Sequence, residues 1–158
     1  MSTTPLIDLT IRDFIRDLAS SDPAPGGGAA AAVAGAMGAA LASMTAALTI
    51  GRPKYADVEA GMQDIHTQSQ RLASDLLALV DADAAAYTGV MQASRLPGRD
   101  EAEQAARHDA IQAAMRQATD VPLAVAEACV QVLELAAVAA EQGNRNARGD
   151  AAAGAHMA

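Results

Sequence analysis

Aromatic and cysteine side chains are nearly absent from this 158-residue chain. One phenylalanine, two tyrosines and no tryptophan leave the core to be built from small aliphatic side chains. The single cysteine, Cys129, excludes an internal disulfide and suits a reducing compartment. Charged residues stand in the first 17 positions, where a secretory leader would carry an apolar segment. These features together predict a cytoplasmic protein.

Positive charge is also scarce. Eleven Lys and Arg residues face 19 Asp and Glu residues, for a net charge of −8, and they form no basic stripe. Because contacts to phosphates require clustered basic side chains, we expect neither a nucleic acid nor an anionic membrane surface as partner. The three histidines, His66, His108 and His156, lie far apart without a second ligand at helical spacing, so the sequence predicts no metal site.

What the chain has in abundance is alanine, the best helix former. Pro and Gly gather in a few clusters that separate long segments with helical periodicity, and no segment is typical of a strand. We therefore predict one all-α domain over residues 1–158, a bundle of long antiparallel helices around a central Ala/Gly-rich helix. The expected helices span residues 10–20, 28–50, 57–96, 101–142 and 151–158.

The helix expected at 28–50 is long enough to cross a bilayer. It contains Ser43, Thr45 and Thr49 and has no aromatic belt, which favours a buried helix instead. Its surface of alanine and glycine is smooth all round. We therefore expect other helices to surround it on every side.

The helix expected at 57–96 carries a carboxylate where an apolar residue is expected. Its apolar seam repeats with alternating spacings of four and three, and Asp83 falls on that seam. Burying an uncompensated polar group costs about 2–7 kcal/mol. Asp83 therefore either pairs with a group such as Lys54 or transfers protons. On the seam of the helix expected at 101–142, His108 is expected to be a core or interface histidine.

The segment "DPAPGGG", residues 22–28, leads directly into the Ala-rich helix. Free N–H groups and the positive end of the helix dipole make such a start an anion site. A tight turn between two helices explains the same glycines equally well. Similarly, Asn144, Asn146 and Asp150 lie in a predicted turn, where turn chemistry alone accounts for them.

Four stretches in this order resemble the cyclodeaminase/cyclohydrolase family of folate enzymes. They are "DPAPGGGAAAAVAGAMGAALASMTAALTIGRPKY", "LLALVDADAAAYTGVMQASRLP", "AIQAAMRQATDVPLAVAEACVQVLELA" and "GNRNARGDAAAGAHMA". The resemblance covers nearly the whole chain. It implies an all-helical fold that is usually dimeric. The family has Ser where this chain has Ala29 and Gly149, and its domain continues beyond residue 158, so we expect its C-terminal part to be missing here.

The resemblance implies a tetrahydrofolate one-carbon derivative as substrate, with no further cofactor and no metal. We expect hydrolysis of 5,10-methenyltetrahydrofolate to 10-formyltetrahydrofolate, because no formiminotransferase is fused to the chain. The alternatives are the cyclodeaminase reaction, which closes 5-formiminotetrahydrofolate and releases ammonia, and a non-catalytic folate-binding or oligomeric module. By their matches to family motifs, the site residues are Asp83 and Lys54, expected to be catalytic, and, for substrate binding, Asp22, Pro25, Gly26, Gly27, Gly28, Tyr55, Asn144, Asn146 and Asp150.

Overall fold

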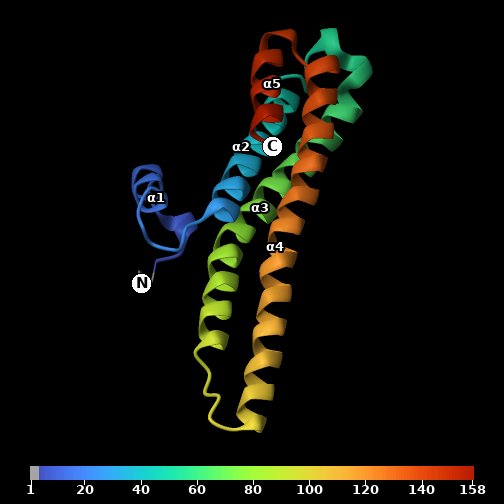
Figure 1. The fold of residues 1–158 in the computed structure, drawn as a ribbon. Helices are drawn as coiled ribbons and strands as arrows, with labels where there is room; N and C mark the ends of the chain where they lie inside the picture. The colour runs from blue at the N-terminus through green and yellow to red at the C-terminus, as the bar shows by residue number, and fades with distance from the viewer. Residues whose placement is uncertain (1–3) are drawn as a thin grey trace. The chain divides into compact units, whose positions relative to one another are not determined.

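Helices and short turns make up the part of the chain that the computed structural model describes, residues 4–158 (Figure 1). Over that range there is no strand, so the predicted all-α class is confirmed. The elements are η1 (Leu6–Asp8), α1 (Ile11–Leu18), α2 (Gly27–Ala47), η2 (Pro53–Val58), α3 (Glu59–Ser94), α4 (Glu101–Gln142), η3 (Arg145–Ala147) and α5 (Arg148–Met157).

The described chain forms two compact units. The first contains the residues up to Ala30 together with Leu79–Ala124, and the second contains Ala31–Ala78 together with Val125–Ala158. Each of α2, α3 and α4 supplies a segment to both units. The expectation of a single family domain over the whole chain stays a prediction.

The first unit holds η1, α1, the glycine-rich loop and the hairpin formed by the end of α3 and the start of α4 (Figure 1). Thr10 caps α1, since its hydroxyl accepts a hydrogen bond from the N–H of Asp13 at 3.1 Å. Phe14 is the buried residue of this short helix. The N-terminal segment is tied to α3, because the N–H of Leu6 donates to Asp81 Oδ1 at 2.6 Å.

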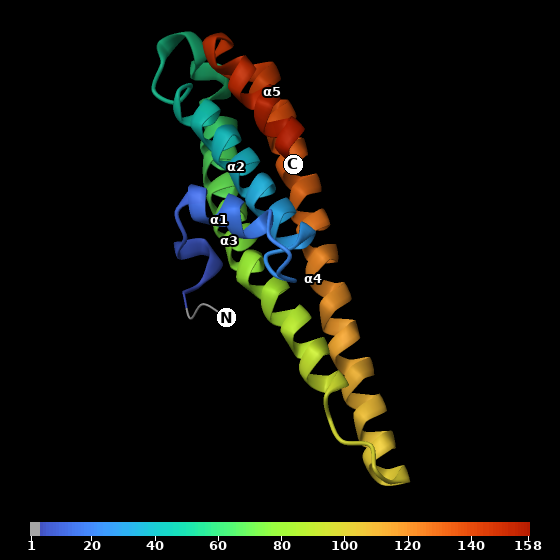
Figure 2. The ribbon, with the colours of Figure 1, turned by 60° about the vertical axis from the view of Figure 1, so that its left-hand side comes forward.

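The second unit brings α5 against α2 (Figure 2). The two helices approach so closely that a Cβ on Gly38 would lie 2.6 Å from the carbonyl oxygen of Gly154. Neither position accepts a side chain without a shift of backbone, which explains why small residues occupy this contact. A core cluster lies in the same unit and consists of Ala46, Met62, Ile65, Ala139 and Ala151.

The expectation that α2 is surrounded on every side is wrong. One face of the helix carries Met37 and Met44, which are 45% and 39% exposed. Leu48, just after the helix, lies on the same face and is 39% exposed. Because the close contacts use the Ala and Gly face, the longer side chains remain on the opposite face. By length and composition α2 and α4 could each cross a membrane, but the core helix of a soluble protein passes the same test. The predicted absence of a membrane partner stays a prediction.

Several details of the predicted elements are also wrong. The α-helix of α2 ends at Ala47 instead of Ile50, and α5 begins at Arg148 instead of Ala151. His108 is not a core residue. Its imidazole is 72% exposed and lies 3.5 Å from the carboxylate of Asp109. Buried positions on α4 begin at Val125, and the seam residues Ile111 and Ala118 before it are only half-buried.

Candidate functional site

The Asp83 carboxylate lies against the first turn of α2. Its Oδ2 accepts a hydrogen bond from the N–H of Ala29 at 3.0 Å, and the side chain is half-buried. A Cβ on Gly28 would lie 2.6 Å from Asp83 Cγ and would overlap the carboxylate oxygens, so the bare glycine backbone makes room for the acid. A carboxylate is favourable here because the helix N-terminus carries free N–H groups and positive partial charge.

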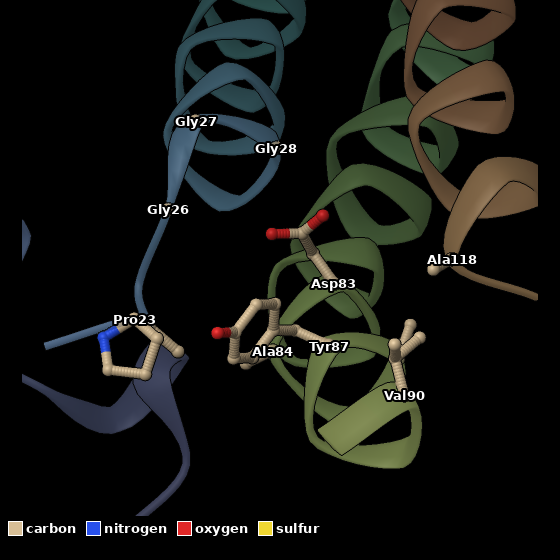
Figure 3. A pocket seen from close by; sticks show the side chains of 11 residues that line it. Pro23, Gly26, Gly27, Gly28, Asp83, Ala84, Tyr87, Val90 and Ala118 are labelled. Atoms are coloured by element: carbon tan, nitrogen blue, oxygen red, sulfur yellow. The ribbon is translucent and has the colours of Figure 1, made fainter. Parts of the chain in front are cut away.

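A pocket of about 290 Å³ opens beside this carboxylate (Figure 3). Its walls come from the glycine-rich loop, from α3 and from Ala118 on α4, all within the first unit. Gly26, Gly27 and Gly28 are among the lining residues, and their predicted contact with substrate stays a prediction. The glycine-rich loop and the seam carboxylate therefore line one pocket.

A second pocket, of about 410 Å³, lies in the second unit where the turn after α2 meets the turn after α4. Its lining is largely polar and cationic, and it consists of Arg52, Pro53, Lys54, Tyr55, Asn144, Arg145 and Asn146. The exposed Lys54 ammonium lies 5.5 Å from the centroid of the Tyr55 ring. None of the three cations forms an ion pair with another described residue. The pocket therefore offers uncompensated positive charge on a chain whose net charge is negative.

Tyr55 is held in this pocket by a backbone contact. Its hydroxyl oxygen accepts a hydrogen bond from the N–H of Arg145 at 3.1 Å. That hydrogen bond and, to a smaller extent, the charge of Lys54 lower the pKa of the Tyr55 phenol. The contact also ties the η2 turn to η3, so residues 90 positions apart share one wall.

The side chain and backbone N–H of Asn144 hold the turn that lines the second pocket. Its Nδ2 donates to the carbonyl oxygen of Leu48 at 3.0 Å, and its Oδ1 accepts from the N–H of Asn146 at 3.1 Å. Its own N–H donates to the Thr49 hydroxyl at 2.8 Å. Both polar atoms of the side chain are therefore engaged in holding the turn, which leaves Asn146 as the exposed amide of this pocket.

The remaining predicted site residues line neither pocket. Asp22 is exposed, and its N–H donates to Ser20 Oγ at 3.0 Å. Pro25 is buried in the loop, and the half-buried Asp150 lies in the first turn of α5. Whether any of the three contacts substrate stays a prediction.

Sequence reasoning missed Tyr87 and Pro23, which line the first pocket beside Asp83. A signal for Tyr87 was present: it lies one helical turn after Asp83, so both side chains share one face of α3. It is also one of only three aromatic residues in the chain. No comparable signal distinguished Pro23 from the other loop residues.

The first pocket places a carboxylate beside open space. Asp83 Oδ1 has no hydrogen-bond donor among residues 4–158, so it is available to a water molecule or a substrate nitrogen. A carboxylate in a partly dehydrated site stabilises a nearby cation and can accept or deliver a proton. Over the same residues, no group of three or more His, Cys, Asp or Glu side chains could hold a metal ion.

Comparison with known proteins finds a matching family model and several similar sequences. The sequence model of the family described as formiminotransferase-cyclodeaminase matches residues 10–158. The chain is 48% identical to a methenyltetrahydrofolate cyclohydrolase of Methylorubrum extorquens over 142 residues, which are 90% of this chain and 68% of that protein. It is 38% identical to the mouse formimidoyltransferase-cyclodeaminase over 127 residues, 80% of this chain but only 24% of that protein.

A solved structure shares the fold. The crystal structure of a formiminotetrahydrofolate cyclodeaminase from Thermotoga maritima superposes with a TM-score of 0.82 at 31% sequence identity. The match covers 95% of this chain and 71% of that one. The sequence and structure comparisons thus point to the same group of proteins.

Proposed function

Because the chain belongs to the formiminotransferase-cyclodeaminase family, we propose that it is a folate one-carbon enzyme that hydrolyses 5,10-methenyltetrahydrofolate to 10-formyltetrahydrofolate. The observation that carries the proposal is the half-buried Asp83 carboxylate at the start of α2, in a pocket with an aromatic wall. The choice of hydrolysis rests on the 48% identity to a cyclohydrolase, against 38% to a bifunctional deaminase.

The reaction requires both protons to leave the water oxygen and one proton to reach nitrogen. The methenyl carbon is cationic and bonded to two folate nitrogens. Water adds to this carbon and loses its first proton, which gives a neutral hydroxyl adduct. The bond to N5 then breaks while N5 takes up a proton, and the hydroxyl loses its second proton as the formyl C=O forms. The sum is methenyl cation plus water giving the 10-formyl compound and one released proton. In the proposed mechanism, Asp83 stabilises the cation, accepts the proton of the attacking water and returns a proton to N5.

The glycine-rich loop supports this role by letting the substrate approach the backbone. With no side chains at Gly26, Gly27 and Gly28, the N–H groups that begin α2 are accessible from the pocket. The N–H of Ala29 holds Asp83, and the N–H groups of the glycines can donate to a polar edge of the pterin. Roles for Asp22 and Asp150 in pterin binding remain part of the proposal.

The cyclodeaminase reaction is a second candidate, favoured by the likeness to the Thermotoga maritima structure. The two reactions are separated by offering each substrate and following the absorbance of the methenyl compound, with a no-enzyme control for the uncatalysed rate. Loss of absorbance from the methenyl compound supports hydrolysis. A gain from the formimino compound together with released ammonia supports deamination. If folates raise the melting temperature without any turnover, the chain is a binding module and the proposed function is wrong.

We further propose that the second pocket binds the carboxylates of the folate glutamate tail. Arg52, Lys54 and Arg145 supply the positive charge there. Carboxylates are matched by such cations, most strongly where guanidinium groups are present. The roles of Lys54, Tyr55 and Asn146 are therefore assigned to binding, while a second proton-transferring role for Lys54 is the alternative.

A Lys54→Met variant tests this assignment. Removing one positive charge from an exposed site that binds carboxylates costs roughly 1–1.5 kcal/mol of binding free energy. The KM should therefore rise about tenfold, with kcat changed less than about threefold. Arg71→Met is the matched control, because it removes one exposed positive charge outside both pockets. A large fall in kcat at unchanged KM would instead assign Lys54 to proton transfer.

Lys54 is also the only lysine of the chain, which permits a chemical test. Acetylation of side-chain amines therefore modifies this position alone, apart from the α-amino group. A folate with its glutamate should protect Lys54 from acetylation, whereas a pteroate without glutamate should not. Equal protection by both compounds would contradict the tail-binding role.

The assembly and location of the protein are likewise proposals. The family resemblance supports a homodimer, and the scarcity of cysteine supports the cytoplasm. Sedimentation of the purified protein would decide the first point, because a monomer at assay concentration contradicts it.

A further inference from the structure

Tyr87 forms the aromatic wall of the first pocket. It projects from α3 one turn after Asp83, and both residues line the same 290 Å³ space with Pro23 and the glycines (Figure 3). Its side chain is 40% exposed. The phenol oxygen points toward the loop that carries Pro23 (Figure 3).

The other two aromatic rings of the chain have structural contacts that Tyr87 lacks. Phe14 is buried in α1, and the Tyr55 hydroxyl accepts the N–H of Arg145. For the Tyr87 hydroxyl, no hydrogen-bond partner exists within residues 4–158. A large ring that stays accessible beside a half-buried carboxylate is a feature of a ligand site more than of a core.

The combination of ring and carboxylate fits a flat cation. An aromatic face attracts a cation placed over it, and planar rings stack on it in offset geometry. The Asp83 carboxylate adds negative charge at the neighbouring wall. The methenyl form of the folate is planar, conjugated and positively charged across its two nitrogens, whereas the 10-formyl product is neutral at that carbon.

We propose that Tyr87 binds the face of the methenyl-bearing ring system and makes the pocket selective for the cationic folate over its neutral product. This inference rests on the proposed function, since it concerns the same pocket and substrate. The ring acts by contact with the substrate and takes no part in moving the proton. Loss of the cation on hydrolysis weakens the ring–substrate attraction, which favours release of the product.

Substitutions of Tyr87 separate the contribution of the ring from that of the hydroxyl. Tyr87→Leu should raise KM for the methenyl compound about tenfold while kcat changes less than about threefold, because a cation–π and stacking contact is lost. Tyr87→Phe keeps the ring and should stay within about twofold of the parent KM. Inhibition by 10-formyltetrahydrofolate should weaken less than about threefold in Tyr87→Leu, since the neutral product gains only stacking.

Met91→Ala is the matched control, because Met91 is exposed on the same helix one turn further and lines neither pocket. Circular dichroism confirms that each variant is folded. An unchanged KM in Tyr87→Leu overturns the proposal, and so does an equal loss in Tyr87→Phe, which would assign the effect to the hydroxyl. Equal weakening for the methenyl and formyl compounds would overturn the selectivity.

If the proposed function is wrong, the experiments give a different result from those above. If the parent protein turns over neither folate, equilibrium dialysis with the methenyl and formyl compounds replaces the kinetic measurement. Weaker binding of the methenyl compound by Tyr87→Leu than by the parent then supports the role of the ring without catalysis. If the parent binds neither compound, both the function and the role of Tyr87 are wrong.

Discussion

An Asp83→Asn variant is expected to lose about 10²- to 10⁴-fold in kcat for the methenyl compound, the usual contribution of a positioned acid–base group. The amide cannot accept the proton of the attacking water and does not attract the cationic carbon. Single-turnover measurement of methenyl absorbance separates this loss from any change in binding.

The fold should survive this change. The carbonyl oxygen of an asparagine can still accept the N–H of Ala29, which Asp83 Oδ2 accepts at 3.0 Å. Exchanging a charged acceptor for a neutral one at a helix start costs about 1 kcal/mol, which a thermal melt detects as a small shift. Both activity and melting temperature therefore have to be measured on the same preparation.

Asp81→Asn is the matched control for Asp83→Asn. Asp81 is also a half-buried carboxylate that accepts a backbone N–H, from Leu6 at 2.6 Å, but it does not line the pocket. Its substitution should change kcat by less than about threefold, because a structural acceptor is only weakened. If the two variants lose activity equally, or if Asp83→Asn keeps most of its activity, Asp83 does not transfer the proton.

The second large effect is expected from Gly28→Ala. The added methyl group would lie 2.6 Å from Asp83 Cγ, so either the first turn of α2 or the carboxylate has to move. Overpacking of this kind costs roughly 1–3 kcal/mol of the free energy of unfolding. Because displacement of a catalytic group by about 1 Å can cost 10²-fold, we expect kcat to fall by about that factor.

Gly27→Ala provides the control for Gly28→Ala on the adjacent residue. A Cβ on Gly27 would have no atom within 4 Å, and its φ is not positive. Alanine at this first helical position should therefore leave the free energy of unfolding equal or higher by up to about 1 kcal/mol, so Gly27→Ala is a control for stability and not for activity, because Gly27 itself lines the pocket. Similar losses in the two glycine variants would show that loop flexibility, and not the space beside Asp83, is what matters.

A double substitution at Gly28 and Asp83 tests whether the added methyl group is harmless once the carboxylate is removed. In an Asp83→Ala background the carboxylate that Gly28→Ala would overlap is absent, so the added methyl group should cost little further stability. A coupling free energy of about 1–3 kcal/mol between the two positions is expected from the cycle of melting experiments, within the range for contacting residues. Additive effects would mean that the two side chains do not compete for one space.

The sequence predicted the helical class and most helix bounds because the signals were local. Thr10, the first residue of the helix expected at 10–20, caps α1, and α4 spans the expected residues 101–142. Periodicity alone could not tell which face of a helix is covered. It therefore placed His108 in a core or an interface, although its imidazole is 72% exposed within the described chain, and it surrounded α2 although Met37 and Met44 are exposed.

The candidate site was partly predictable for a similar reason. Asp83 was recognisable because a carboxylate interrupts an apolar seam, and the loop because three glycines precede a helix. Their juxtaposition depends on contacts between residues 54 positions apart, which no local pattern encodes. For Asn144 the sequence could not decide between a structural role and a binding role. The sequence allowed either turn chemistry or, by its motif position, ligand binding, and the structure uses both of its polar side-chain atoms to hold a turn.

The contact between Gly28 and the Asp83 carboxylate has a consequence for how such chains can diverge. While the acid is present, the glycine cannot acquire a side chain, and once the acid is replaced by a small residue, the constraint on the glycine disappears. Descendants that give up the chemistry should therefore drift at both positions, and a lone change at the glycine should be rare among active relatives.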